Sequence, residues 1–299
     1  MSLFSRFRSE PEDPDLVRGE DLIFSGRYEE GIDSFSRVLQ ANPKNLHALA
    51  GIALGLERLE RFAEAVAFFD RVLALAPGNS DALVGKAICL EHLGKFEEAI
   101  TWYERDLKVN PDAPDVWVGI GRCLSRAGRP RDAIPYFDHV LAENRTYVDA
   151  WTGRGDALFL DRKYDEALES YSTALELHPG AVPVWVSLGR CLIRVRKFEQ
   201  ALSCFDRAIS LDPHATRAWF ERGLCLAGWR RNEEAVHSYD RVIALDPSCG
   251  VAWYEKGRSL DILGEEDKAA ACYEKARSLG YFEFESRVQY HFIEGYTPD

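Results

Sequence analysis

Small and aromatic side chains recur along the chain at a fixed interval of 34 residues. One small residue per interval is followed, four positions later, by an aromatic ring. The small residues are Gly31, Ala65, Ala99, Ala133, Ala167, Ala201, Ala235 and Ala269, and the rings are Phe35, Phe69, Tyr103, Phe137, Tyr171, Phe205, Tyr239 and Tyr273. A period of this length is typical of stacked helical repeats, in which each repeat buries its apolar face against its neighbours.

Both halves of each repeat have the hydrophobic spacing of a helix. In residues 182–215, apolar side chains at i, i+3, i+4 and i+7 run from Trp185 to Leu192 and again from Phe198 to Ile209. Most second halves end in proline, at Pro43, Pro77, Pro111, Pro179, Pro213 and Pro247. Because proline cannot continue the helical hydrogen bonds, each repeat is predicted to be a hairpin of two antiparallel helices.

A second small residue lies at the eighth position of each repeat. These residues are Gly19, Ala53, Ala87, Gly121, Gly155, Gly189, Gly223 and Gly257. Glycine inside a helix costs about 1 kcal/mol relative to alanine. Its repeated use therefore predicts a close contact between the two helices of a hairpin.

Eight repeats fill residues 12–283 of the 299-residue chain. Their boundaries are 12–45, 46–79, 80–113, 114–147, 148–181, 182–215, 216–249 and 250–283. A solenoid grows without enlarging a central core, so we expect one domain. Residues 1–11 are predicted to be an N-terminal arm. Residues 284–299 are predicted to be a capping helix and tail, since Phe284, Val288 and Phe292 are spaced i, i+4, i+8.

The pattern within each repeat resembles that of a known family. The family pattern has tryptophan at position four, glycine at eight, alanine at twenty, an aromatic residue at twenty-four and proline at thirty-two. Repeat 182–215 has all five: Trp185, Gly189, Ala201, Phe205 and Pro213. The chain thus resembles the tetratricopeptide repeat (TPR) family, although the first three repeats have Asp15, Leu49 and Leu83 in place of tryptophan. The resemblance implies an all-α α-solenoid, a right-handed superhelix of antiparallel hairpins whose first helices line a concave groove. It also implies a role in binding proteins or peptides.

Charge and composition narrow the possible partners. The formal net charge of -12 repels nucleic acid and acidic membrane surfaces. No stretch has the apolar length of a signal peptide or of a membrane-spanning helix. We therefore expect a soluble cytoplasmic protein that neither binds nucleic acid nor inserts into a membrane.

The seven cysteines are expected to be packing residues. Cys89, Cys123, Cys191 and Cys225 share the tenth repeat position, so adjacent copies lie about 10 Å apart, beyond the roughly 7 Å limit for a disulfide. There is no CxxC pair, the seven histidines are scattered, and the residues outside the repeats contain no catalytic motif. We expect no metal, no cofactor and no enzymatic activity.

Candidate binding residues follow from the family's geometry, which places six positions of each first helix in the groove. A charged set at positions nine and thirteen comprises Arg122, Arg126, Asp156, Arg190, Arg194 and Arg258. The four guanidinium groups expected around Asp156 could hold a carboxylate or phosphate of a partner; they belong to Arg122, Arg126, Arg190 and Arg194. An equally weighted alternative is a ladder of salt bridges that only keeps the groove solvated.

Two further groove features have both a binding and a packing interpretation. Position six is glycine in Gly51, Gly85, Gly119 and Gly153, which either leaves a bare strip for a ligand backbone or reflects helix packing. Phe220 and Tyr254 at position five, beside Glu221 and Glu255, would suit an apolar or basic side chain if exposed. Ordinary partial burial explains them as well.

These residues predict a scaffold or adaptor that binds a peptide or helix of a partner in the concave groove. The partner would carry an acidic segment and an apolar or basic anchor. Two other functions stay open: a recognition subunit of an enzyme complex, and a structural module that self-associates through its end repeats.

Overall fold

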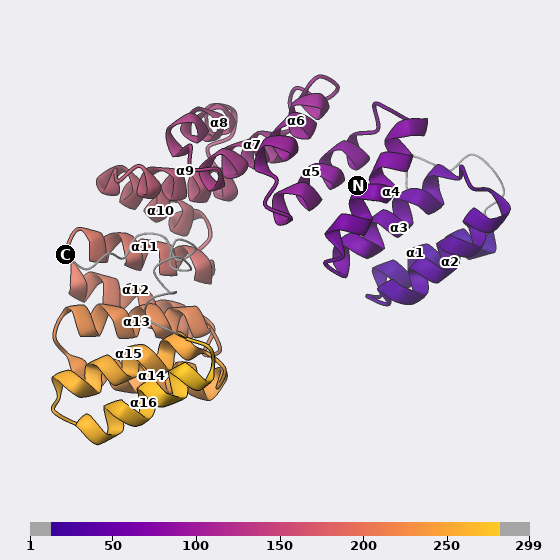
Figure 1. The fold of residues 1–299 in the computed structure, drawn as a ribbon. Helices are drawn as coiled ribbons and strands as arrows, with labels where there is room; N and C mark the ends of the chain where they lie inside the picture. Colours follow the sequence, from indigo (N-terminus) through magenta and orange to yellow (C-terminus); the bar gives the residue numbers. More distant parts are fainter. Residues whose placement is uncertain (1–12, 282–299) are drawn as a thin grey trace. The chain divides into compact units, whose positions relative to one another are not determined.

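The computed structural model describes residues 13–281, and these residues form sixteen helices and no strand (Figure 1). This confirms the all-α repeat fold. The predicted N-terminal arm and C-terminal capping helix lie outside the described residues. None of the described helices has the length and apolar character needed to cross a membrane.

The chain divides into two compact units, residues 1–143 and 144–299. The helices of the first unit are α1 (Pro14–Phe24), α2 (Tyr28–Ala41), α3 (Leu46–Arg58), α4 (Phe62–Leu75), α5 (Ser80–His92), α6 (Phe96–Leu107), α7 (Pro114–Arg126) and α8 (Pro130–Glu143). Those of the second unit are α9 (Val148–Leu160), α10 (Tyr164–Leu177), α11 (Val182–Arg194), α12 (Phe198–Leu211), α13 (Thr216–Gly228), α14 (Asn232–Leu245), α15 (Gly250–Ile262) and α16 (Glu266–Ser278). Each predicted repeat supplies one hairpin.

Within each unit, consecutive helices pack side by side. The first helix of a repeat also contacts the first helix of the next, so α1, α3, α5 and α7 form one wall of the first unit. In the second unit α9, α11, α13 and α15 form the equivalent wall. A residue on a first helix therefore lies near its counterparts from adjacent repeats of the same unit.

The aromatic ring at position twenty-four explains the small residues at position eight. A Cβ atom built on Gly189 would lie 2.6 Å from the ring of Phe205, and one on Gly223 would lie 2.5 Å from that of Tyr239. Both rings are fully buried. The predicted close contact between the two helices of a hairpin is confirmed, and glycine leaves the space that the ring fills.

Glycine at position six also faces such a ring, but from the preceding repeat. A Cβ atom on Gly85 would lie 2.4 Å from Phe69, and one on Gly119 would lie 2.8 Å from Tyr103. A bare strip open to a ligand backbone is therefore wrong for the first unit. The aromatic ring of the neighbouring repeat occupies the space that the missing side chain leaves.

Tryptophan at position four ties each repeat to the loop before it. The indole Nε1–H of Trp185 donates a hydrogen bond to the carbonyl oxygen of Pro179 at 2.9 Å, and Trp117, Trp219 and Trp253 bond in the same way to Pro111, Pro213 and Pro247. Where proline is absent, Trp151 donates to the carbonyl oxygen of Arg145 at 2.8 Å. The bond uses a backbone oxygen, so it survives the loss of proline.

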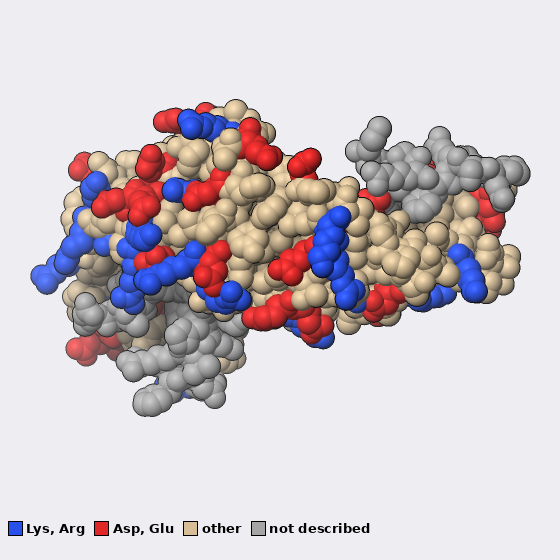
Figure 2. All heavy atoms as spheres, turned by 90° about the horizontal axis from the view of Figure 1, so that it is seen from above, with Lys and Arg blue, Asp and Glu red and all other residues tan. Residues whose placement is uncertain are grey.

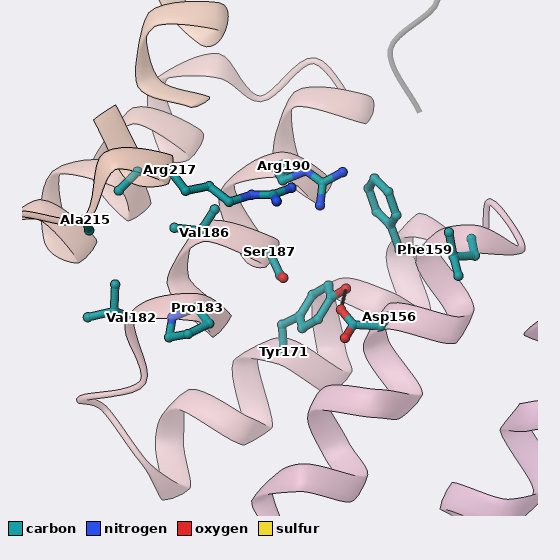
Figure 3. A pocket seen from close by; sticks show the side chains of 12 residues that line it. Asp156, Phe159, Tyr171, Val182, Pro183, Val186, Ser187, Arg190, Ala215 and Arg217 are labelled. Atoms are coloured by element: carbon teal, nitrogen blue, oxygen red, sulfur yellow. Dashed lines mark hydrogen bonds between the residues drawn. The ribbon is translucent and has the colours of Figure 1, made fainter. Parts of the chain in front are cut away.

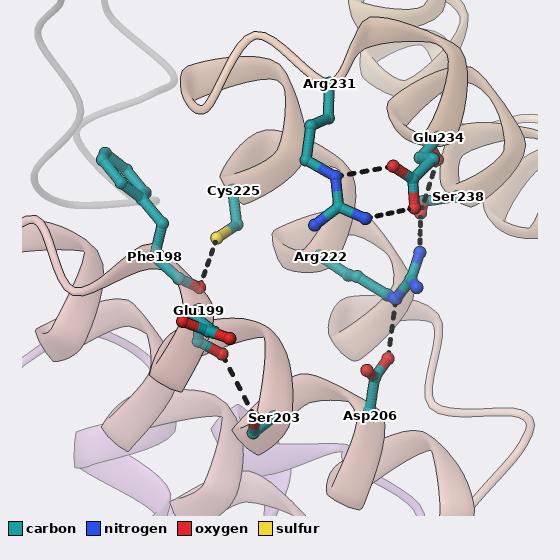
Figure 4. Close-up of polar contacts among 9 residues, drawn as sticks. All are labelled: Phe198, Glu199, Ser203, Asp206, Arg222, Cys225, Arg231, Glu234 and Ser238. Atoms are coloured by element: carbon teal, nitrogen blue, oxygen red, sulfur yellow. Dashed lines mark hydrogen bonds and ion pairs between the residues drawn. The ribbon is translucent and has the colours of Figure 1, made fainter.

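Cys191 and Cys225, at position ten, each contact the start of the second helix of the preceding repeat. The Sγ–H of Cys191 donates to the carbonyl oxygen of Tyr164 at 3.3 Å, and that of Cys225 to the carbonyl oxygen of Phe198 at 3.6 Å (Figure 4). Burial raises the pKa of Cys89, Cys123, Cys191 and Cys225 to about 12. These thiols are therefore neutral packing groups at physiological pH.

Candidate functional site

A pocket of about 440 Å³ opens on the wall formed by α9, α11 and α13 of the second unit (Figure 3). Its size lies within the range of ligand pockets in proteins. The lining residues are Asp156, Phe159, Leu160, Tyr171, Val182, Pro183, Val186, Ser187, Arg190, Ala215, Arg217 and Ala218. Most of them are apolar, and the charged groups lie at the sides.

The pocket lies where position six is serine instead of glycine. In the first unit, the glycine at this position lets the next repeat close over the preceding ring, as Gly85 does over Phe69. At this junction the residue is Ser187, and both Ser187 and Tyr171 line the pocket. One edge of the Tyr171 ring is therefore part of the pocket wall.

One side of the pocket carries a carboxyl group. The hydroxyl of Tyr171 donates a hydrogen bond to Asp156 Oδ1 at 2.7 Å. Asp156 is exposed, and the bond from Tyr171 and the positive charges of Arg190 and Arg217 favour its charged form. Burial and the adjacent carboxyl group raise the pKa of Tyr171 well above its ordinary value, so Tyr171 stays a donor to Asp156.

Two guanidinium groups line the pocket away from this carboxyl group and share one buried acid. Arg190 Nε lies 3.3 Å and Arg217 Nη2 3.5 Å from Glu221 Oε1. The side chain of Glu221 is only 7% exposed, whereas that of Arg217 is 55% exposed. Burial raises the pKa of Glu221, and the two arginines oppose the rise. Arg217 therefore keeps donors directed to solvent while Glu221 holds it in place.

Arg190 also borders the apolar part of the pocket. Its guanidinium carbon lies 5.2 Å from the centroid of the Phe159 ring, a cation–π distance. Its side chain is 21% exposed, less than half of the value for Arg217. The pocket thus combines an apolar floor, one carboxyl group and two guanidinium groups, which suits an apolar group next to a charged one.

Of the predicted charged set, the structure brings Asp156 and Arg190 together in this pocket. Arg194, from the same helix as Arg190, donates from Nε to the hydroxyl of Tyr164 at 3.3 Å. Arg258 lies 3.1 Å from Glu255 Oε2.

Arg122 and Arg126 belong to the first unit, where both bind Glu91. Arg122 donates from Nε and Nη2 to the two carboxylate oxygens of Glu91 at 2.5 and 2.8 Å, and Arg126 Nη1 lies 3.3 Å from Oε1. Glu91 is buried, at 4% exposure. For these two arginines the salt-bridge alternative describes the contacts, and their role in holding a partner stays a prediction.

The two predicted aromatic residues differ in exposure. Phe220 is 8% exposed and its ring centroid lies 5.9 Å from that of Tyr239, so the burial interpretation applies to Phe220. Tyr254 is half-buried, with its ring 5.5 Å from that of Tyr273 and 5.2 Å from that of Tyr281.

Sequence reasoning missed Phe159, Ser187 and Arg217 as lining residues. Arg217 holds position two of its repeat, which the resemblance places in the groove, so its position alone could have identified it as a candidate. Ser187 at position six and Phe159 at position twelve also hold groove positions of the family, but the sequence alone did not show that they line one pocket with Arg217.

Comparisons with known proteins agree with this architecture. Three family models, each described as tetratricopeptide repeat, match residues 188–252, residues 56–123, and residues 16–80, 120–182 and 230–280. The third model alone matches more than half of the chain. No curated protein matches the chain significantly.

Solved structures show the same fold. A tetratricopeptide repeat protein from Parabacteroides merdae superposes with a TM-score of 0.70 at 17% identity, covering 82% of this chain and 97% of that chain. MamA from Desulfovibrio magneticus gives a TM-score of 0.52 at 20% identity, covering 56% of this chain and 96% of that chain. With eight hairpins of matching pattern and a family model over most of its length, the chain belongs to the tetratricopeptide repeat family.

Proposed function

We propose that the protein is a scaffold or adaptor whose second unit binds a peptide segment of another protein. Proteins built from tetratricopeptide repeats generally mediate protein–protein interactions, and this fold is typically non-enzymatic. The segment lies along the groove formed by the first helices. One apolar side chain of the segment enters the pocket between α9, α11 and α13.

The exposed guanidinium of Arg217 beside an apolar floor is the observation that carries this proposal. Arg217 is held by Glu221 at its buried side and offers its remaining N–H donors to a carboxylate of the partner. Val186 and Phe159 supply the apolar contact next to it. The preferred segment therefore places an aspartate or glutamate beside a large apolar residue.

A cytoplasmic location is part of the proposal. The position-ten cysteines are free, buried and protonated, which suits a reducing compartment. Two alternatives stay predictions: that the protein is the recognition subunit of an enzyme complex, and that it self-associates through its end repeats.

The test compares two serine-to-tryptophan variants in a peptide-display selection. Ser187→Trp fills the pocket, whereas Ser172→Trp places the same ring on the exposed face of α10, outside the pocket. We expect wild type and Ser172→Trp to enrich the same peptides, rich in apolar residues next to acidic ones, and Ser187→Trp to lose them. If Ser187→Trp keeps the wild-type melting temperature and still enriches the same peptides, the pocket is not the binding site.

A further inference from the structure

The turns between the two helices of each repeat contain one residue with a left-handed backbone. At this position, the fifteenth of the repeat, four repeats have glycine, with φ of 80° at Gly26, 74° at Gly94 and 77° at Gly128 and Gly264. The second repeat has Glu60 there, at 59°, and three consecutive repeats of the second unit have arginine: Arg162 at 63°, Arg196 at 62° and Arg230 at 62°. Glycine adopts this backbone without strain and arginine does not. Strain of this kind repeated on one residue type points to a role for the side chain.

Within residues 13–281, no acidic side chain forms an ion pair with these arginines. The residue at position sixteen, directly after these arginines, is also basic in seven repeats. At position sixteen the cation usually pairs with an acid three residues further on, as Arg61 does with Glu64 and Arg231 with Glu234 (Figure 4). Arg162, Arg196 and Arg230 are all exposed and form no ion pair with residues 13–281. The three guanidinium groups are thus available to an outside partner.

Neighbouring turns of the second unit lie against one another. Tyr164 directly follows the turn of Arg162, and its carbonyl oxygen accepts a hydrogen bond from Cys191 of α11, the helix that leads into the turn of Arg196. In the same way Phe198 follows the turn of Arg196 and accepts from Cys225 of α13, which leads into the turn of Arg230. The ring of Phe198 also stacks on that of Trp229 at 6.3 Å. The three arginines therefore share one edge of the second unit, about 8–10 Å apart by ordinary helix packing. None of them lines the pocket described above.

We propose that these three arginines, the arginine edge, form a second docking surface that binds an extended acidic segment of a partner protein. An extended chain advances about 3.3 Å per residue, so a carboxylate at every third position reaches the next guanidinium group. Arginine binds carboxylates through two parallel N–H donors.

The surroundings of the arginine edge favour a narrow partner. Exposed acids, Glu199 and Glu233 among them, begin the helices that follow these turns. Mixed charge is also seen elsewhere on the molecule: on the face drawn in Figure 2, Lys and Arg side chains are interspersed with Asp and Glu. A membrane or a nucleic-acid duplex would meet these acids as well, whereas a single peptide strand follows the row of arginines alone.

The test replaces the three arginines by glycine. Arg162→Gly, Arg196→Gly and Arg230→Gly together remove the charges and relieve the backbone strain, so the variant keeps or raises the melting temperature of the wild type. The probe is a fluorescent peptide with glutamate at every third position and glycine or serine between, followed by anisotropy. We expect wild type to bind it in a salt-dependent manner and the triple variant to bind about tenfold more weakly. Glu60→Gly makes the same turn change in the first unit and should leave the affinity for the peptide unchanged.

Three outcomes would overturn the proposal: no binding of the peptide by wild type, equal binding by the triple variant, or tighter binding of single-stranded DNA or phosphatidylserine vesicles at the same ionic strength. Ser187→Trp should bind this peptide as wild type does. A failure of the pocket proposal therefore leaves this measurement unaffected.

Discussion

Gly51 lies against the ring of Phe35, close enough that a Cβ atom built on Gly51 would be 2.4 Å from it. The same ring also faces Gly19, at 2.7 Å from a Cβ built there, so it is held between its own repeat and the next. Phe35 is fully buried. Cohesion between repeats in the first unit therefore depends on the absence of a side chain at position six.

Gly51→Ala should destabilise the protein despite alanine's better helix propensity. Overpacking against a buried ring costs about 1–3 kcal/mol, and with a Cβ atom only 2.4 Å from the ring we expect the upper part of this range, above the gain of about 1 kcal/mol from replacing glycine in a helix. Urea unfolding followed by circular dichroism measures the difference. Gly78→Ala is the matched control, because a Cβ atom there meets nothing within 4 Å. Equal stability of the two variants would contradict the packing role of position six.

The repeat fold was predictable because each hairpin restates the same pattern. Position eight, with Gly189 against Phe205, was correctly assigned to helix contact, since a glycine in a helix needs a steric reason. The sequence did not decide between the binding and the packing interpretation of position six. Gly85 faces Phe69, a ring from the preceding repeat, and only the stacking of the repeats shows that contact. The 34-residue period passes through the boundary between the two compact units without a change, so the sequence pattern does not mark that boundary.

The candidate site was predictable only in part. Asp156 and Arg190 were selected because they share a groove position, and both line the pocket. The sequence could not show that Glu221, buried at position six, would pair with Arg190, nor that Glu91 would pair with Arg122. Those partners come from adjacent repeats at different positions, so their pairing depends on the offset between first helices.

Trp185→Phe should weaken the junction between the fifth and sixth repeats. The substitution keeps an aromatic ring but removes the donor to the carbonyl oxygen of Pro179 at 2.9 Å, at a cost of about 0.5–1.5 kcal/mol. Trp229→Phe is the control, since the Trp229 ring is 40% exposed and lies in a turn. Hydrogen exchange should show faster exchange around residues 179–185 in Trp185→Phe alone. Unchanged exchange and stability would show that the indole bond contributes nothing to the junction.

Arg122→Glu should destabilise the first unit and would therefore be a poor probe of partner binding. It places a second carboxylate beside buried Glu91, which keeps its pair with Arg126 at 3.3 Å but loses the closer one with Arg122. Arg122 is half-exposed, so we expect a loss of about 1–3 kcal/mol, below the 3–5 kcal/mol typical of breaking a fully buried pair. Arg129→Glu is the control, since its pair with Asp132 is exposed on both sides and worth about 0–1 kcal/mol. A double-mutant cycle with Glu91→Gln measures the coupling, and additive effects would refute it.

Glu221 should make the stability of the second unit fall as the pH rises. Burial raises its pKa above the ordinary value of 4.5, so the folded state binds a proton that the unfolded state has already released. The free energy of unfolding therefore decreases from about pH 4.5 up to the raised pKa and is level above it. Glu221→Gln removes this titration. The stability of wild type relative to Glu221→Gln should thus be greatest near pH 4.5 and smaller at pH 7, measured by urea unfolding at each pH. A difference that does not change with pH, or that grows as the pH rises, would show that Arg190 and Arg217 compensate fully for the burial of this carboxyl group.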